Sequence, residues 1–391
     1  MSSSVPIPFS EPPWLMGLPS PYYNASHRKW QKTCRALVDE LLGDAGDWEK
    51  EGDVPVDLYQ KFVSANFLIP NLPSPLPVKW LKELGITHLP GDLPVEEFDY
   101  MHTLIFTDEM HRSGSLGPSG AITTALQARF LPDLLTGKKR ICIAITEPGA
   151  GSDVSAIETT ARKSDDGSEW IVDGSKKWIT NGLWSDYATM AVRTGGAGPA
   201  GLSLLIVPLL QHPGVTMRRI KVGGQTAAGT TFIELDNVRV PRENLIGTEG
   251  SGMKYIMQNF NHERLSISIS VNRIARTALS QAFEYVMKRK AFGKPVMDQP
   301  VVRNRLARCG AELESHWAWI EGFTWMMTRL GEEDANRIFR EIPGARIPGG
   351  SEDVMLDLSI RQLVKNYQAK MKMKNELEET GLERPRGGSK L

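Results

Sequence analysis

Hydrophobic residues recur with a helical period in the first third of the chain. Between about residues 25 and 138, apolar side chains are spaced three or four positions apart, as in Trp30, Cys34, Leu37 and Leu41. This spacing is typical of amphipathic helices. Proline-rich stretches at 70–77 and 90–94 separate the helices. We therefore predict an N-terminal helical domain over residues 1–138.

The pattern changes between residues 139 and 250, where short β-prone runs alternate with turns. The dipeptides Asp166-Gly167 and Asp173-Gly174 predict two tight turns beside strands at 170–172 and 177–180. Further strands are expected at 187–192, 202–207, 215–220 and 231–240. Their regular spacing predicts a middle β-domain, a barrel or a sandwich, over residues 139–250.

Helical periodicity returns at Gly252 and predicts a C-terminal helical bundle over residues 251–380, followed by a flexible tail over 381–391. Further helices are expected at 301–330 and 352–373. Separate helical, β and helical blocks predict an α+β fold. The first helix of the bundle has one apolar stripe, made of Met253, Ile256, Met257, Phe260, Ile267, Val271, Ile274 and Ala278.

Glu263 lies on this stripe, three residues after Phe260 and four before Ile267. We expect its carboxylate to face the interior, with adjacent Arg264 projecting elsewhere on the helix. A carboxylate in an apolar layer without a local cation has a raised pKa, which suits a general base. A salt bridge to a distant Lys or Arg is the alternative interpretation.

Three further segments have the composition of ligand-binding turns. Glycines and hydroxyls in the loop 146–153 could bind a flat polar ring or a phosphate, although such loops are more often simple turns. At 178–182 an aromatic side chain and a hydroxyl meet at a strand end, where core packing is the alternative. The glycines of 347–353 precede a predicted helix start and could present N–H groups to an anion, unless Ser351 simply caps that helix.

Charge and cysteine usage exclude several classes of protein. Among 391 residues, Lys plus Arg number 46 and Asp plus Glu number 46. A neutral chain has no electrostatic footprint for nucleic acid or an anionic membrane. No apolar run approaches the roughly 18 residues of a membrane span. Three dispersed cysteines and seven scattered histidines argue against a disulfide framework and a metal site.

The chain ends in Ser389-Lys390-Leu391, which is a peroxisomal address read by an import receptor at a free C-terminus. Chance occurrence of the tripeptide is the alternative. The preceding residues 384–388 are rich in Arg, Pro and Gly, which favours the exposed tail that such a signal needs. The N-terminus lacks the basic and apolar regions of a signal peptide. We therefore expect a peroxisomal protein.

Four segments in order resemble the acyl-CoA dehydrogenase family over most of the chain. They are CIAITEPGAGSDV, KKWITNG, LDNVRVPRENLIGTEGSGM and RKAFGKPVMDQPVVRNRLA. The wording looks most like a fungal branch. The resemblance implies the three-domain fold predicted above. Two stretches, 119–131 and 330–346, are shorter than is usual in the family, which puts FAD affinity in doubt more than the fold.

The resemblance also implies FAD and a set of residues that bind it. Within one chain, the flavin-lining and flavin-covering residues are Ile145, Thr146, Gly151, Ser152, Trp178, Ile179 and Thr180. Gly350 and Ser351 are also expected to contact the cofactor. Arg289, Phe292 and Gln299 match positions that reach the flavin of a neighbouring subunit, which implies a homodimer or homotetramer.

The family places its catalytic glutamate at one of two sites. Gly349 occupies the first, where it has no side chain to act, and Glu263-Arg264 fits the second. We therefore expect Glu263 to be the base, Arg264 and Ser152 to contact the substrate, and the Gly349 N–H to bind the thioester oxygen. The expected reaction is FAD-dependent α,β-desaturation of an acyl-CoA. Two alternatives are an acyl-CoA oxidase that reduces O₂ to hydrogen peroxide and a degenerate acyl-CoA-binding paralogue without activity.

Overall fold

The computed structural model describes residues 7–120 and 130–330. Several predicted features lie outside these residues. They are Gly349, Gly350, Ser351, the tripeptide Ser389-Lys390-Leu391, the helix expected at 352–373 and most of the two shortened stretches.

Seven α-helices precede the sheet within the described residues. They are α1 (Ala25–Leu41), α2 (Ala45–Glu51), α3 (Leu58–Ser64), α4 (Val78–Glu83), α5 (Tyr100–Met110), α6 (Leu116–Gly120) and α7 (Leu131–Leu135). Trp30, Cys34 and Leu41 of α1 are buried, as their spacing predicts, and every residue of α5 is buried. A small hairpin joins β1 (His88–Leu89) to β2 (Leu93–Pro94). The helical core is therefore built around α5.

The middle of the chain forms one eight-stranded mixed sheet. Its strands are β3 (Ile141–Ala144), β4 (Thr160–Lys163), β5 (Glu169–Ile179), β6 (Tyr187–Arg193), β7 (Leu202–Pro208), β8 (Val215–Arg219), β9 (Thr231–Pro241) and β10 (Leu245–Ile246). The order is β10-β7-β6-β4-β5-β9-β8, and β3 pairs with β6 in parallel. The sheet does not close into a barrel, and the predicted α+β class is confirmed.

One of the two predicted turns is absent. Asp166-Gly167 does form the turn between β4 and β5, with Gly167 at φ +69°. Asp173-Gly174 instead lies inside β5, so the prediction of a turn there is wrong. The pairing of β5 with β9 shifts register at this point, and the Asp173 carboxylate accepts a hydrogen bond from the Asn237 N–H at 2.7 Å. The dipeptide therefore forms a bulge, because the neighbouring strand continues past it.

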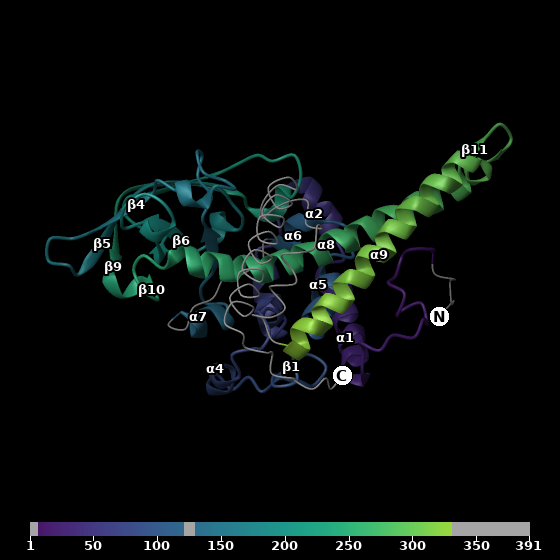
Figure 1. The fold of residues 1–391 in the computed structure, drawn as a ribbon, viewed down its shortest axis with the longest axis horizontal. Helices are drawn as coiled ribbons and strands as arrows, with labels where there is room; N and C mark the ends of the chain where they lie inside the picture. Colours follow the sequence, from purple (N-terminus) through teal and green to yellow (C-terminus); the bar gives the residue numbers. More distant parts are fainter. Residues whose placement is uncertain (1–6, 121–129, 331–391) are drawn as a thin grey trace, which may run out of the picture.

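Two long helices follow the sheet and set the shape of the molecule. α8 (Gly252–Lys288) runs from the sheet across the helical domain to the opposite end, where β11 (Lys290–Ala291) pairs with β12 (Lys294–Pro295) (Figure 1). α9 (Pro300–Leu330) returns beside it. Within the described residues, short 3-10 helices occupy seven connections: η1 Ile69–Asn71, η2 Val154–Ala156, η3 Gly182–Trp184, η4 Pro199–Gly201, η5 Thr226–Ala228, η6 Arg242–Asn244 and η7 Val296–Asp298.

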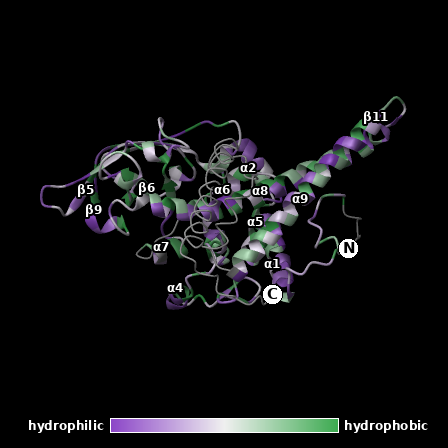
Figure 2. Cartoon of the chain, viewed as in Figure 1, coloured by the Kyte–Doolittle hydropathy of each residue, from purple (hydrophilic) through white to green (hydrophobic). Residues whose placement is uncertain are grey.

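The predicted apolar stripe of α8 is buried only in part. Ile256 is buried, but Val271 is 54% exposed and Ala278 is also exposed. The buried face of the second half includes Leu265, Ile269, Arg264, Asn272, Arg273 and Arg276. Figure 2 shows hydrophilic and hydrophobic residues alternating along α8 and α9. The stripe prediction is therefore wrong beyond Phe260.

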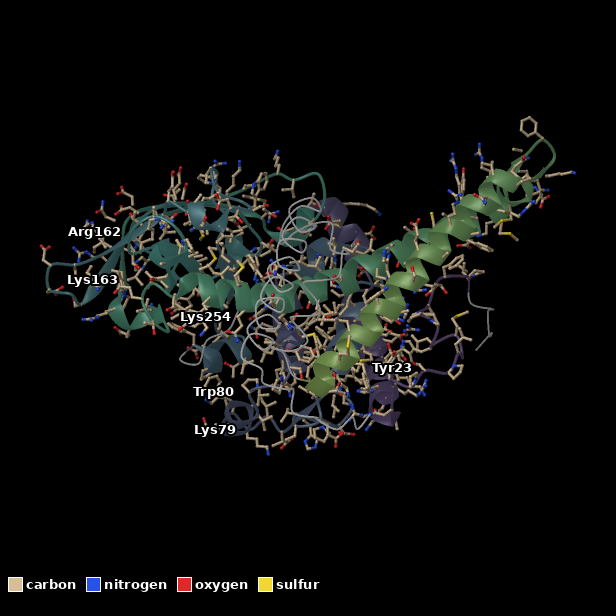
Figure 3. All side chains as sticks on the ribbon, in the orientation of Figure 1. Tyr23, Lys79, Trp80, Arg162, Lys163 and Lys254 are labelled. Carbon is tan, nitrogen blue, oxygen red and sulfur yellow. The ribbon has the colours of Figure 1, made fainter. Side chains whose placement is uncertain are left out.

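Buried ion pairs explain why arginines take the inner face. Arg273 binds both carboxylate oxygens of Asp108 on α5, with Nε 2.7 Å from Oδ1. Arg276 makes a two-pronged contact of 2.7 and 2.8 Å with Glu314 on α9. Tyr23, which lies beside α9 in Figure 3, donates a 2.6 Å hydrogen bond to Glu321. These contacts join α5, α8, α9 and the segment before α1.

No described helix is long and apolar enough to cross a membrane.

Candidate active site

A buried ion pair holds the loop 146–153 against the sheet. Lys176 Nζ lies 2.7 Å from Glu147 Oε1 and 3.1 Å from the carbonyl oxygen of Ile145. The Glu147 carboxylate also accepts hydrogen bonds from the N–H groups of Glu158 and Thr159. Burial lowers the pKa of Lys176 to about 8, although the charge of Glu147 opposes this. The loop is thus fixed at its base by residues on β5 and before β4.

The same strand brings Trp178 beside the loop. The Lys177 N–H donates a 2.9 Å hydrogen bond to the Thr146 carbonyl. A register shift between Lys176 and Ile179 breaks the β5 pairing there, and Trp178 adopts a φ of +64°. Trp178 is 51% exposed, and Lys177 Nζ lies 4.8 Å from the centroid of its ring. A bulky residue at positive φ is uncommon and indicates a position that the surrounding structure imposes.

The predicted cofactor residues on this strand end divide into two groups. Thr180 is exposed beside Trp178, whereas the Ile179 side chain is buried in the core of the β-domain. Only the backbone of Ile179 can therefore reach a ligand.

The tip of the loop is open. Gly151 and Ser152 are exposed, and a Cβ added at Gly149 or Gly151 would meet nothing within 4 Å. Half-buried Thr146 and the Trp178 ring border the same segment. An accessible aromatic face next to exposed hydroxyls and loop amides fits a flat, polar ring system such as a flavin. The residues present therefore fit the cofactor that the motifs imply.

One hydrophobic cluster joins the loop to the start of α8. Ile145, Ala150 and Val154 are buried together with Ile256, and Phe260 packs against the same cluster. Leu265 and Ile269, further along α8, belong instead to the core of the helical domain. α8 thus passes from one core to the other between residues 260 and 265, and this stretch contains Glu263.

Glu263 is exposed at this junction, so the expectation that it faces the interior is wrong. Protein nevertheless surrounds the carboxyl closely enough that desolvation raises its pKa, while the charge of Arg264 lowers it. None of the ion pairs within residues 7–120 and 130–330 involves Glu263. The accessible carboxylate thus has a raised pKa, which is the property that a general base requires.

Arg264 is buried directly beside this carboxylate. Its guanidinium donates a 3.2 Å hydrogen bond to Asn261 Oδ1 and lies 5.8 Å from the Phe260 ring centroid. Arg264 was expected to project elsewhere on the helix, yet its charge still acts on Glu263 and opposes the effect of desolvation on the pKa of that carboxyl.

His262 is a polar neighbour that sequence reasoning missed. Its ring centroid lies 6.1 Å from that of Tyr100 at the start of α5. Burial lowers the pKa of the imidazole to about 4, so the ring is neutral at physiological pH. Its Nδ1 is buried and has no hydrogen-bond partner among the described residues. No sequence signal singles it out, since only the approach of α5 buries it.

Arg289, Phe292 and Gln299 do not join this site within one chain. Arg289 directly follows α8 and Phe292 lies in the hairpin after it, at the end of the molecule opposite the sheet (Figure 1). Phe292 is 97% exposed, and Arg289 is exposed as well. Contact of these residues with a flavin in a second chain remains a prediction.

A second polar cluster lies in the helical domain. His27, Asp99 and His102 present atoms within 4.8 Å of one another, close enough to bind a metal ion. The separate histidines gave no sign of this, because the fold brings α1 and α5 together. Each histidine also closes a capping box at the start of its helix, and Asp99 lies 3.2 Å from His27 Nε2 and 2.8 Å from His102 Nδ1. These mutual contacts account for the cluster as a joint between two helix starts.

Comparisons with known proteins agree with the fold and the loop. The acyl-CoA dehydrogenase middle domain matches residues 142–238, and the acyl-CoA dehydrogenase C-terminal domain matches 250–335. The acyl-CoA dehydrogenase apdG of Emericella nidulans is 56% identical, covering 94% of this chain and 97% of its own. That alignment spans 426 positions, more than the 391 residues here, so the relative has positions that this chain lacks.

Two solved structures share the fold. An acyl-CoA dehydrogenase from Geobacillus kaustophilus aligns with a TM-score of 0.71 and 26% identity over 88% of this chain and all of that one. A protein described as an FAD-dependent dehydrogenase has a TM-score of 0.71 at 21% identity, covering 87% of this chain and 98% of that one, which shows the fold alone. The extensive identity to apdG is what assigns the function class: this chain belongs to the acyl-CoA dehydrogenase family.

Proposed function

We propose that this protein catalyses the FAD-dependent α,β-desaturation of an acyl-CoA thioester, with Glu263 as the base. The observation that supports this most is the position of Glu263 at the junction of the two cores. It is an accessible carboxylate with a raised pKa, and the turn of α8 that precedes it packs on the loop 146–153. A base and a cofactor loop joined through one rigid cluster suit the transfer of two hydrogens from adjacent carbons.

Glu263 would accept the α-proton of the thioester in its ionised form. Partial desolvation makes a carboxylate more basic, which brings it nearer to the weak acidity of a carbon acid. Negative charge that develops on the thioester oxygen needs hydrogen-bond donors. The Gly349 N–H, the donor expected from sequence, lies outside the described residues. When bound, FAD would supply the redox chemistry by taking up the β-hydrogen as hydride.

The accessible Trp178 side chain beside the open tip of the loop 146–153 supports the cofactor assignment. We expect the isoalloxazine ring to lie against Trp178 and the edge of the loop at Thr146, with Ser152 within reach of the substrate. The Glu147–Lys176 pair would hold that loop in place without touching the ligand. Arg264, whose guanidinium is buried beside the base, is proposed to contact the CoA moiety.

We also propose that the active oligomer is a homodimer or homotetramer in which the β11–β12 hairpin reaches a neighbouring chain. Phe292 supports this, because an aromatic residue that is 97% exposed has no packing partner within the described part of its own chain. The peroxisomal address at residues 389–391 stays a prediction.

Flavin bleaching tests the proposal directly. Purified protein should be yellow after reconstitution with FAD, and anaerobic addition of acyl-CoA should bleach it. Absorbance near the flavin bands is the readout, and a panel of acyl-CoAs scored in this way ranks substrates. Protein that binds FAD but is not bleached by any acyl-CoA would overturn desaturation and favour the non-catalytic binder.

Reoxidation separates the remaining alternative. A peroxisomal enzyme that passes electrons to O₂ would release one hydrogen peroxide per bleaching cycle when air is readmitted. A dehydrogenase would stay reduced much longer and would transfer its electrons to a mediator dye.

A further inference from the structure

His262 is a half-buried polar residue beside the proposed base that the desaturation mechanism does not use. Its Nδ1 is enclosed by protein and has no partner within the described ranges 7–120 and 130–330. A buried nitrogen without a hydrogen bond destabilises the fold, because it has lost its contact with water and gained no partner. Native proteins leave few such groups unpaired, and those that they keep call for an explanation such as a ligand.

The position of His262 defines where such a ligand would lie. Consecutive residues of an α-helix point about 100° apart, so the imidazole lies to one side of the Glu263 carboxylate. On that side, its ring approaches Tyr100 of α5, which is 3% exposed. Because His262 directly precedes Glu263 on α8, a substrate whose α-carbon reaches Glu263 would have its acyl part within reach of this side of the helix.

We propose that His262 is a specificity-determining residue, and that its Nδ1 hydrogen-bonds an oxygen substituent, a hydroxyl or carbonyl, on the acyl chain of the substrate. This inference rests on the proposed function, because it takes Glu263 to mark the α-carbon. An unsubstituted hydrocarbon chain would leave the nitrogen unpaired after excluding water from it. A chain with a neutral oxygen would supply the missing partner.

The charge state of the ring narrows the class of substituent. Desolvation is the only cause of its lowered pKa, and no charged group pairs with it within the described chain. A neutral imidazole has one donor and one acceptor nitrogen, which matches a hydroxyl or a carbonyl. A carboxylate substituent would need a cation in this place.

Matched substrates and variants test the proposal. Two saturated acyl-CoAs of equal length, one unsubstituted and one with an oxo or hydroxyl group on the γ-carbon, are compared by kcat/KM of anaerobic flavin reduction. Wild-type protein should prefer the oxygenated substrate by about tenfold or more, the ratio expected when a buried polar group gains a partner. His262→Leu should remove this preference by lowering kcat/KM for the oxygenated substrate toward that for the unsubstituted one. His316→Leu, at an exposed histidine on α9, is the matched control and should behave as wild type.

Binding separates this inference from the proposed function. Calorimetric affinities of the same two ligands should show the same ratio in wild type and lose it in His262→Leu. A retained binding ratio without flavin reduction would sink desaturation and leave the role of His262 standing. Equal affinity and equal kcat/KM of wild type for the two ligands would overturn the inference. A loss of thermal stability in His262→Leu without any change in the ratio would also overturn it, because His262 would then have an internal partner.

Discussion

The two halves of α8 solve the same packing problem in different ways. From Gly252 to Phe260 the helix buries apolar side chains, with Ile256 at 1% exposure against the loop 146–153. From Arg264 onward it buries two arginines at least as deeply, Arg273 at 1% and Arg276 at 0%. In the first half, the hydrophobic pattern of the helix determines which face is buried. In the second half, carboxylates on distant elements determine it, because they pair with the arginines.

Glu263 lies at the boundary between the apolar first half of α8 and the second half with its buried arginines. Arg273 and Arg276 each have a carboxylate partner within 2.8 Å. Glu263, by contrast, forms no ion pair with a cation in the described chain. Buried charges that are paired stabilise a joint, and a surrounded charge without a pair shifts its pKa. The contrast indicates that catalytic chemistry is expected where a surrounded charge has no ion-pair partner. Five experiments test this interpretation.

The largest effect is expected at the boundary. Glu263→Gln keeps the size and polarity of the side chain but removes the base, so flavin reduction by acyl-CoA should fall by about 10² to 10⁴. FAD binding should be retained, because the loop cluster and Trp178 are unchanged. Stopped-flow absorbance gives the rate and the visible spectrum gives occupancy. A Gln variant that is bleached at the wild-type rate would exclude Glu263 as the base.

Flavin reduction and thermal stability should both depend on pH, and the direction of each change follows from the raised pKa of Glu263. The base acts when ionised, so wild-type reduction should rise with pH around a midpoint above the ordinary glutamate value. A raised native pKa also means that the ionised form weakens the fold at high pH and not at low pH. The melting temperature of Glu263→Gln should therefore equal that of wild type at low pH. It should increasingly exceed it as the pH rises through the unfolded-state and folded-state pKa values of Glu263.

Much of the fold could be predicted from sequence, because local patterns determine local structure. Trp30, Cys34 and Leu41 are buried at the spacing that indicates a helix, and the five-residue and longer strands lie close to where β-prone runs occur. Asp173-Gly174 shows the limit, since its composition favours a turn but β9 extends alongside and keeps the strand going. Long-range pairing overrides turn preference there.

The site was predictable only as a set of segments. The motifs indicate Thr146, Trp178 and Glu263, but not that Lys177 links the first two or that Ile256 and Phe260 connect the third to them. The inward direction expected for Glu263 fails because Arg273 and Arg276 turn the second half of the helix toward Asp108 and Glu314. Such partners, far apart in sequence, are visible only after folding.

The second largest effect should arise from a paired charge. Arg273→Met leaves the Asp108 carboxylate buried without its cation and should lower the free energy of unfolding by about 3–5 kcal/mol. Urea denaturation measures the loss. The double variant Arg273→Met with Asp108→Leu should recover part of it, since no unpaired charge remains. A single variant as stable as wild type would show that the ion pairs are not what orients the second half of α8.

A smaller loss is expected in the apolar half. Ile256→Val removes one methylene from the cluster shared with the loop and should lower the free energy of unfolding by about 0.5–1.5 kcal/mol. The affinity for FAD should weaken modestly as well, because Ile145 and Ala150 pack on the same residue. Fluorescence titration of FAD measures this second effect. Unchanged FAD affinity at reduced stability would mean that the cluster supports the fold without positioning the loop.

The smallest effect is expected at Val271, on the exposed face of the second half of α8. Val271 is 54% exposed on the face that the sequence predicted to be buried. Val271→Thr is close in shape, and at a solvent-exposed site it should change the free energy of unfolding by no more than about 0.5 kcal/mol. The same substitution at a covered apolar site would bury a hydroxyl without a partner and cost about 1–3 kcal/mol. Urea denaturation at several protein concentrations distinguishes the two cases, because a cost that grows with concentration would assign the cover to a second chain. A loss of about 1–3 kcal/mol at every concentration would show that other residues of the same chain cover Val271. The two halves of α8 would then differ in the residues that they contact and not in how exposed they are.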